Sequence, residues 1–162
     1  MKYPKLMFHV VLIEPEIPAN TGNIGRTCVG LWSRLHLVGK LGFEINDRQL
    51  RRAGLDYWSR LEYEHHPDWD SWWSLVEDPS RVFFLETQGQ KPYFEQRFRP
   101  GDWLVFGRES QGLPESVLQK YASQTLTIPC PGDIRSLNLS NAVSMVVGEG
   151  IRQNYSLLTG AE

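Results

Sequence analysis

Three polar loops that contain glycine are the places where this chain could do chemistry. They are Asn20–Arg26, Phe106–Pro114 and Ile128–Asn141. Glycines such as Gly107 and Gly112 let the backbone approach a ligand closely or adopt a positive φ. One loop of this kind, taken alone, is equally well explained as a plain strand-to-helix turn with proline at the first helical position. Because three such loops each stand at the end of an expected strand, we expect them to converge in space.

The polar side chains of these loops suit ligand binding. Glu109 is a carboxylate placed between the two glycines of the middle loop. In the last loop, Ser136 and Asn138 can cap the helix that follows, since their side-chain oxygens accept hydrogen bonds from free backbone N–H groups. Residues 136–141 hold four residues of the capping type, which is more than one cap requires. Some of them are therefore free to bind a ligand.

Common nucleotide-binding and metal-binding patterns are absent from the sequence. No G-x-G-x-x-G follows an expected strand and no G-x-x-x-x-G-K-[ST] occurs, which disfavours an ordinary dinucleotide or NTP-hydrolysing site. The histidines lack metal-ligand spacing and no Cys/His cluster occurs, so we expect no metal. These histidines are His9, His36, His65 and His66.

Length and composition bound the class of protein. A chain of 162 residues, 41% of them hydrophobic, can close one substantial core but not two, so we expect a single domain over residues 1–162. With a formal net charge of -2, any polyanion must be met by a local basic patch. Only two cysteines occur, and no apolar run reaches the roughly 20 residues of a membrane span. We expect a cytoplasmic protein without disulfides or a membrane partner.

Apolar runs and turn signals predict strands that alternate with helices. Such a succession favours an α/β domain with a mainly parallel sheet, flanking helices, and ligands at the carboxyl ends of the strands. The expected strands are 6–13, 35–38, 82–86, 102–106 and 126–128. The expected helices run from an N-cap at Asn20 or Thr21 to about 31, and over 47–54, 67–76, 114–121 and 138–154.

Two aromatic-rich segments have alternative interpretations. Basic residues interleaved with aromatics could pair RNA phosphates and stack a splayed base, although a solvated helix face with a core aromatic has the same pattern. Three tryptophans at helical spacing are better explained as core or interface filling than as a stacking platform. The basic segment holds Arg48, Arg51, Arg52, Tyr57, Trp58 and Arg60, and the tryptophans are Trp69, Trp72 and Trp73.

The three loops, taken together, resemble the motifs of a known enzyme class. Pro18–Arg26, Phe106–Pro114 and Ser136–Ala142 are similar, in order, to the three motifs of the SPOUT-class RNA 2'-O-methyltransferases. Glu14–Pro18 and Arg51–Tyr57 look like the small TrmL (YibK/CspR-type) branch, which methylates the wobble nucleotide of certain tRNAs. The similarity spans nearly the whole chain.

The resemblance implies a fold, an assembly and a cofactor. The C-terminal segment would be threaded into a deep trefoil knot, which protein chains generally avoid, and the active form would be a homodimer. S-adenosylmethionine would bind in the knotted loops, largely through backbone groups. The positions that match its binding loops are Leu85, Gly107, Ile128, Ser136 and Leu137.

The resemblance also implies roles in catalysis. Arg26 would act at the ribose hydroxyl, near the cofactor of the partner subunit. Since a guanidinium is effectively always protonated, we expect Arg26 to hold the adjoining phosphate and lower the pKa of the hydroxyl instead of acting as the base. Asn20, Glu109 and Asn138 would orient partners. The sequence departs from related chains at Gly148, where they tend to carry an aromatic residue.

The resemblance implies that the substrate is the 2'-hydroxyl of nucleotide 34, a cytidine or modified uridine, in tRNA(Leu)-type tRNAs. The anticodon stem-loop would contact Arg48, Arg51, Arg52 and Tyr57. Two alternatives stay open. The first is the same chemistry on another tRNA position or on ribosomal RNA, because cofactor loops do not specify the target. The second is a non-catalytic RNA or nucleotide binder with this fold.

Overall fold

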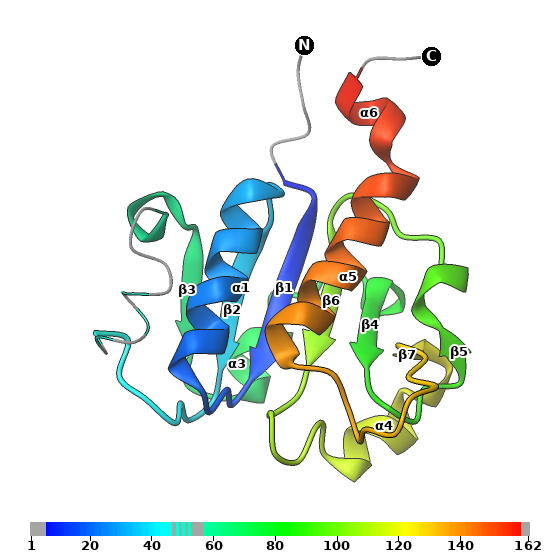
Figure 1. The fold of residues 1–162 in the computed structure, drawn as a ribbon, viewed down its shortest axis with the longest axis horizontal. Helices are drawn as coiled ribbons and strands as arrows, with labels where there is room; N and C mark the ends of the chain where they lie inside the picture. Colours follow the sequence, from blue (N-terminus) through cyan, green and yellow to red (C-terminus); the bar gives the residue numbers. More distant parts are fainter. Residues whose placement is uncertain (1–5, 47, 49, 51, 53–56, 160–162) are drawn as a thin grey trace.

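A computed structural model describes residues 6–46, 48, 50, 52 and 57–159. Within these ranges seven strands form one sheet in the order β3-β2-β1-β6-β4-β7-β5, and every neighbouring pair is parallel (Figure 1). The α/β class with a parallel sheet is therefore confirmed. The strands are β1 (Phe8–Ile13), β2 (Arg34–Val38), β3 (Tyr63–His66), β4 (Val82–Leu85), β5 (Lys91–Pro92), β6 (Asp102–Phe106) and β7 (Thr125–Thr127).

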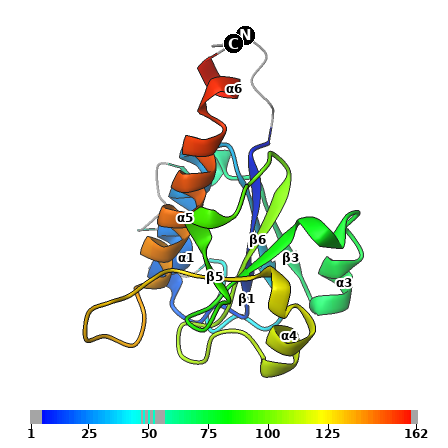
Figure 2. The same ribbon diagram turned by 90° about the vertical axis from the view of Figure 1, so that its right-hand side faces the viewer.

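Helices cover both faces of the sheet, as the side view in Figure 2 shows. Helices α1 (Pro18–Gly30) and α5 (Leu139–Gln153) pack side by side on one face, while α3 (Trp69–Trp73) and α4 (Glu115–Lys120) lie on the other. The C-terminal helix α6 (Tyr155–Thr159) follows α5. Short 3-10 turns occupy Trp58–Arg60, Pro79–Arg81, Tyr93–Glu95 and Ala122–Gln124.

The central strands are buried on both faces because their side chains alternate between two cores. In β1, Val10 and Leu12 pack beneath α1 and α5, whereas Val11 and Ile13 face the opposite core. Trp72 is completely buried in that second core, with Trp69 and Trp73 packed against it. The tryptophans therefore fill the core, as expected.

Differences between expected and observed elements occur at polar or short segments. Strands β3 and β5 were not expected, because β3 is Tyr-Glu-His-His and β5 has two residues, and neither shows an apolar run. The helix expected over 67–76 is shorter: Asp68 caps it and it ends at Trp73. In the helix expected over 47–54, only residues 48, 50 and 52 are described, and all three are helical.

The start of α1 also differs from expectation. The N-cap is Ile17, not Asn20 or Thr21, and its side chain makes no capping hydrogen bond. Pro18 stands at the first helical position, where its fixed φ suits the helix and its missing N–H is not needed. Asn20 and Thr21 are consequently inside the first turn, and both are buried.

Helix α5 begins and ends within one residue of the expected positions. Asn138 is its N-cap, and the side-chain Oδ1 accepts hydrogen bonds from the N–H groups of Ser140 and Asn141. The trefoil knot stays a prediction. No helix in the described ranges is long and apolar enough to cross a membrane.

Two glycines of α5 have different surroundings. A Cβ placed on Gly150 would lie 2.5 Å from Cζ of the buried Phe8 ring, whereas a Cβ on Gly148 would meet nothing within 4 Å. The lack of a side chain at Gly150 therefore lets α5 approach the end of β1 closely.

We expect Gly150→Ala to lower the free energy of unfolding. Overpacking against Phe8 costs about 1–3 kcal/mol, which outweighs the gain of up to about 1 kcal/mol in helix propensity. Gly148→Ala is the matched control, and it should raise stability by up to about 1 kcal/mol. Urea denaturation of both variants at equal protein concentration measures the difference. Equal stabilisation by the two alanines would contradict the packing of α5 on Phe8.

Candidate functional site

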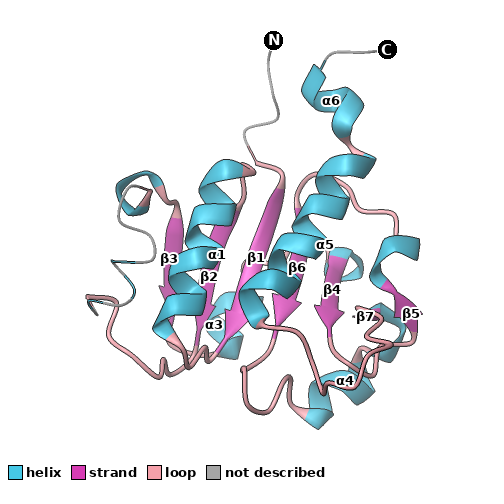
Figure 3. Cartoon of the chain, in the orientation of Figure 1, coloured by secondary structure: helices cyan, strands magenta, loops and turns pink. Residues whose placement is uncertain are grey.

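The three polar loops meet at one end of the sheet. Figure 3 shows the connections after β1, β6 and β7, which contain these segments, gathered with that after β4 at the end to which the strand arrows point. They enclose a cavity of about 610 Å³, a volume within the range of small-molecule and cofactor sites. The expected convergence is therefore confirmed for the last two loops and for Asn20, whereas residues 20–26 form part of helix α1 and residues 21–26 do not line the cavity. All five expected cofactor positions line this cavity: Leu85, Gly107, Ile128, Ser136 and Leu137.

A chain of side-chain hydrogen bonds connects the three loops. Asn138 Nδ2 donates to Asn20 Oδ1 at 3.0 Å, and Asn20 Nδ2 donates to Glu109 Oε1 at 3.4 Å. Asn20, Glu109 and Asn138 all line the cavity as well. Each loop contributes one residue, so the contacts hold together segments that lie 89 and 118 residues apart in sequence.

Glu109 also holds the chain that enters α1. Its Oε2 accepts a hydrogen bond from the backbone N–H of Glu16 at 2.8 Å, and its Oε1 accepts one from the N–H of Ile17 at 3.0 Å. A carboxylate near a helix N-terminus is stabilised by N–H groups that have no partner within the helix and by the helix dipole. Glu109 therefore fixes the backbone of the two residues that precede Pro18, the first residue of α1.

The glycines of the middle loop allow it to fold back on itself. A Cβ on Gly107 would lie 2.2 Å from the backbone carbon of Gly112, and the backbones of Arg108 and Gly112 exchange hydrogen bonds of 3.2 and 2.9 Å. Gly112 has a φ of +66°, a conformation that favours glycine. The Glu86 carboxylate fits against it and accepts a hydrogen bond from Leu113 N–H at 2.9 Å.

Two further carboxylates join the loop after β1 to the middle loop. Glu14 pairs with Arg108, and Glu16 accepts hydrogen bonds from the Ser110 hydroxyl at 2.6 Å and the Ser110 N–H at 3.3 Å. The hydrogen bond from the hydroxyl, more than that from the N–H, lowers the pKa of Glu16. The ionised form of Glu16 thus helps to hold the loop at neutral pH.

Sequence reasoning missed these supporting residues. Glu14 and Glu86 follow directly on strands β1 and β4, and Arg108 is the second residue after β6. That position is the available signal, because the carboxyl ends of parallel strands meet at one edge of a sheet. Arg135 was also missed; it donates to the Ser110 carbonyl at 3.2 Å and ties the last loop to the middle one.

Arg26 does not line the cavity within the described part of its own chain. It is exposed on α1, six residues beyond Asn20, or about 9 Å further along the helix axis. Its guanidinium lies 4.7 Å from the centre of the Tyr57 ring, and that of Arg60 lies 5.5 Å from the same ring. Arg26 is therefore grouped with the expected RNA-binding segment and not with Asn20, Glu109 and Asn138.

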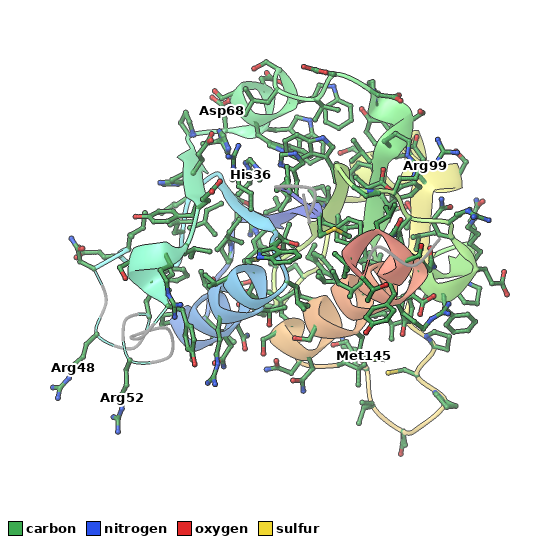
Figure 4. All side chains as sticks on the ribbon, turned by 90° about the horizontal axis from the view of Figure 1, so that it is seen from above. His36, Arg48, Arg52, Asp68, Arg99 and Met145 are labelled. Carbon is green, nitrogen blue, oxygen red and sulfur yellow. The ribbon has the colours of Figure 1, made fainter. Side chains whose placement is uncertain are left out.

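Arg48 and Arg52 are exposed, and Figure 4 shows both side chains extending outward from the molecule. They lie beyond the side of the sheet covered by α1 and α5, on the same side as Met145 and away from His36. Arg51 lies outside the described residues. The exposed side chains of Arg48 and Arg52 can therefore contact a partner molecule.

The residues around the cavity fit S-adenosylmethionine. Leu85, Ile128 and Leu139 offer apolar surface for a purine ring and for the carbons beside sulfur. Glu86 provides a carboxylate at the wall, where it can balance the positive charge of a sulfonium. The backbone of the loops supplies N–H and C=O groups to fix orientation.

Comparison with known proteins supports the expected class. The model of the SpoU rRNA methylase family matches residues 7–148. A tRNA (cytidine(34)-2'-O)-methyltransferase of Burkholderia ambifaria is 46% identical over 149 residues, which cover 91% of this chain and 96% of the relative.

Solved structures agree with this match. One, concerned with 2-OH methylation of C/U34 on tRNA, superposes with a TM-score of 0.88 at 44% identity and covers 95% of this chain and 94% of the other. AviRb of Streptomyces viridochromogenes, solved with its cofactor AdoMet, shares the fold with a TM-score of 0.81 at 23% identity over 94% of this chain and 62% of AviRb.

The fold is thus that of the SPOUT methyltransferases. The chain belongs to the SpoU methylase family.

We expect Gly107→Ala to abolish binding of S-adenosylmethionine, because an added Cβ would push the Gly112 backbone out of place and distort the loop that walls the cavity. Gly132→Ala is the matched control in the last loop, where a Cβ would meet nothing within 4 Å and affinity should stay within twofold. Isothermal titration with the cofactor provides the measurement. Unchanged affinity in Gly107→Ala would show that this cavity does not bind the donor.

Proposed function

We propose that this chain transfers the methyl group of S-adenosylmethionine to the ribose 2'-hydroxyl of the wobble nucleotide, cytidine or modified uridine 34, in tRNA(Leu)-type tRNAs. The observation that carries the proposal is the cavity whose three loops are joined by Glu109, Asn20 and Asn138. The proposal is supported by family membership and by a relative that carries the name of this activity at 46% identity over most of both chains.

Bound S-adenosylmethionine would supply the reactive methyl group. The cofactor would be held from the walls of the cavity by Leu85, Gly107, Ile128, Ser136 and Leu137. The protein's main task is then positioning, since the attacking oxygen must be in line with the S–CH3 bond. The loops that fix the cavity are held by Glu109, which is anchored to the backbone entering α1.

We propose that the Arg26 required at each site comes from the partner subunit of a homodimer. Arg26 lies outside the cavity of its own chain, on the exposed surface of the α1 and α5 pair. The same surface carries Met145, which is 41% exposed, and the Gly148 position with open space above it. Arg26 then holds the phosphate beside the reacting sugar and lowers the pKa of its hydroxyl.

The anticodon stem-loop is proposed to contact Arg48, Arg51, Arg52 and Tyr57. Arginines pair with phosphates, and the Tyr57 ring, which two guanidiniums contact, would support a splayed base. A tRNA-modifying enzyme of this kind would act in the cytoplasm. The alternatives, another RNA position or a non-catalytic binder, are outcomes of the experiment that follows.

The experiment incubates purified protein with labelled S-adenosylmethionine and total tRNA from a strain that lacks its own enzyme, and then maps the methylated nucleotide. We expect label at nucleotide 34. Label at another position, or only in ribosomal RNA, would support the first alternative. Tight cofactor binding without transfer to any RNA would support the second.

We expect Arg26→Ala to abolish transfer and to leave affinity for S-adenosylmethionine within a few fold, because Arg26 does not line the cavity. Single-turnover transfer and cofactor titration give the two values. Arg99→Ala removes an exposed arginine elsewhere on the molecule and should change neither. Equal loss of transfer and cofactor binding in Arg26→Ala would contradict the assigned role.

Mixing two inactive variants tests whether Arg26 acts across subunits. When Arg26→Ala and Gly107→Ala are unfolded and refolded together, mixed dimers contain one intact cofactor cavity facing one intact Arg26. We expect part of the transfer activity to return. If Arg26 served its own chain, no mixture would recover activity.

Arg48→Ala and Arg52→Ala should each weaken tRNA binding and make it less dependent on salt. Each lost phosphate contact is expected to reduce the slope of log K against log [salt] by roughly 0.7 to 0.9. Affinity is measured by filter binding at several salt concentrations, with Arg99→Ala as the control. A slope that does not change in either variant would contradict a phosphate contact.

A further inference from the structure

Three histidines from neighbouring strands form a continuous row on the α3 side of the sheet. His9 Nδ1 lies 2.9 Å from His36 Nε2, and His36 Nδ1 lies 3.0 Å from His66 Nε2. The His9 ring also stacks on Trp103, with 3.8 Å between the ring centres. Figure 4 shows His36 on this side, away from Arg48 and Arg52, so the row is separate from the methyl-transfer site.

The register of the sheet brings these residues together. His36 of β2 is paired with Glu64 of β3, and Val38 is paired with His66. Because side chains alternate along a strand, Glu64 and His66 project from the same face as His36. One of these residues comes from strand β2 and two come from β3, a spacing unlike the local patterns of zinc motifs, so the expectation of no metal, which rested on sequence spacing, did not take this cluster into account.

We propose that His36, His66 and Glu64 bind a divalent transition-metal ion, with Zn²⁺ as the best match. The three residues offer two imidazole nitrogens and a carboxylate oxygen whose atoms all lie within 4.8 Å of one another. Imidazole and carboxylate ligands are typical of zinc, and three protein ligands leave a fourth position for water.

The present distances need only small adjustments. Two nitrogens bound to one tetrahedral zinc at about 2.0–2.1 Å stand roughly 3.3 Å apart, compared with 3.0 Å between His36 Nδ1 and His66 Nε2. Glu64 Oε2 is 3.8 Å from His66 Nε2. The Glu64 side chain is 49% exposed, so it can move inward while the imidazoles keep their places in the sheet.

The third histidine positions the first. His36 Nε2–H donates to His9 Nδ1 in the arrangement that frees the Nδ1 lone pair of His36 for the metal. His66 then carries its single proton on Nδ1 and presents Nε2 to the metal. Without the ion, His66 Nε2–H donates the hydrogen bond to His36 Nδ1 at 3.0 Å, so binding shifts this proton to His66 Nδ1 and leaves both imidazoles neutral.

The charges around the cluster are balanced for a cation. Arg34 is the nearby positive group, and it forms an ion pair with Glu62 at 2.7 Å. Glu64 supplies one negative charge directly to the ion. A bound ion would tie the edge strand β3 to β2, just after the segment of Tyr57 and Arg60 that is proposed to contact tRNA.

The test uses the full-length protein stripped of metal with a chelator. We expect one Zn²⁺ to bind per chain in competition with a chromophoric chelator. One Co²⁺ bound in its place should give the visible absorption of a four-coordinate site. Bound Zn²⁺ should also raise the melting temperature of the protein. Glu64→Gln, which changes an exposed side chain, should weaken binding at least tenfold and remove the rise in melting temperature. His9→Phe should weaken it roughly 10- to 100-fold through loss of the partner of His36.

His65→Gln is the matched control, because His65 projects from the other face of β3 and its Nε2 contacts the Gly39 carbonyl at 2.9 Å. Its affinity for Zn²⁺ should stay within twofold of the parent protein. The proposal is overturned if the parent protein binds no Zn²⁺ below millimolar concentration, if His65→Gln weakens binding as much as Glu64→Gln, or if the Co²⁺ spectrum shows thiolate ligation by Cys130. His66→Gln removes a proposed ligand of the cluster and should weaken Zn²⁺ binding at least as much as Glu64→Gln.

Discussion

The functional end of this molecule depends on the hydrogen bonds that the Glu109 carboxylate accepts. This carboxylate accepts hydrogen bonds from two backbone N–H groups ahead of α1 and from the side chain of Asn20. Since Asn20 in turn accepts from Asn138 at the cap of α5, one carboxylate orders three loops. Without these hydrogen bonds, the polar groups at the carboxyl end of the sheet would bind water instead. The loops around the cavity would then have no fixed positions.

This arrangement separates two tasks along α1. Its first turn, with Asn20, forms part of the proposed cofactor cavity, whereas Arg26 in the later turns lies on the outer surface beside Tyr57. A single helix thus links the proposed donor site to the proposed RNA surface. Since the arginine is remote from its own cavity, the proposed second subunit would complete each site and would cover the exposed face of α1 and α5.

The sequence predicted those parts of the molecule that are encoded locally. Buried strands such as 102–106 have continuous apolar runs, and the Asn138 cap precedes a long helix with an apolar face, so both were identified closely. Strand β3 and the row of histidines could not be predicted, because β3 is polar and its partners are set by sheet register. The loops were recognised as a set, but Glu86 and Arg108 were missed, since their roles depend on which loops become neighbours.

The most direct test of the account is a crystal structure of the protein with bound S-adenosylmethionine or its demethylated product. We expect the ligand in the cavity lined by Gly107, Ile128 and Leu137, with the hydrogen bond between Asn20 and Asn138 intact. A ligand bound elsewhere, or loops that stand apart when it is bound, would contradict the claim that Glu109 organises a donor site.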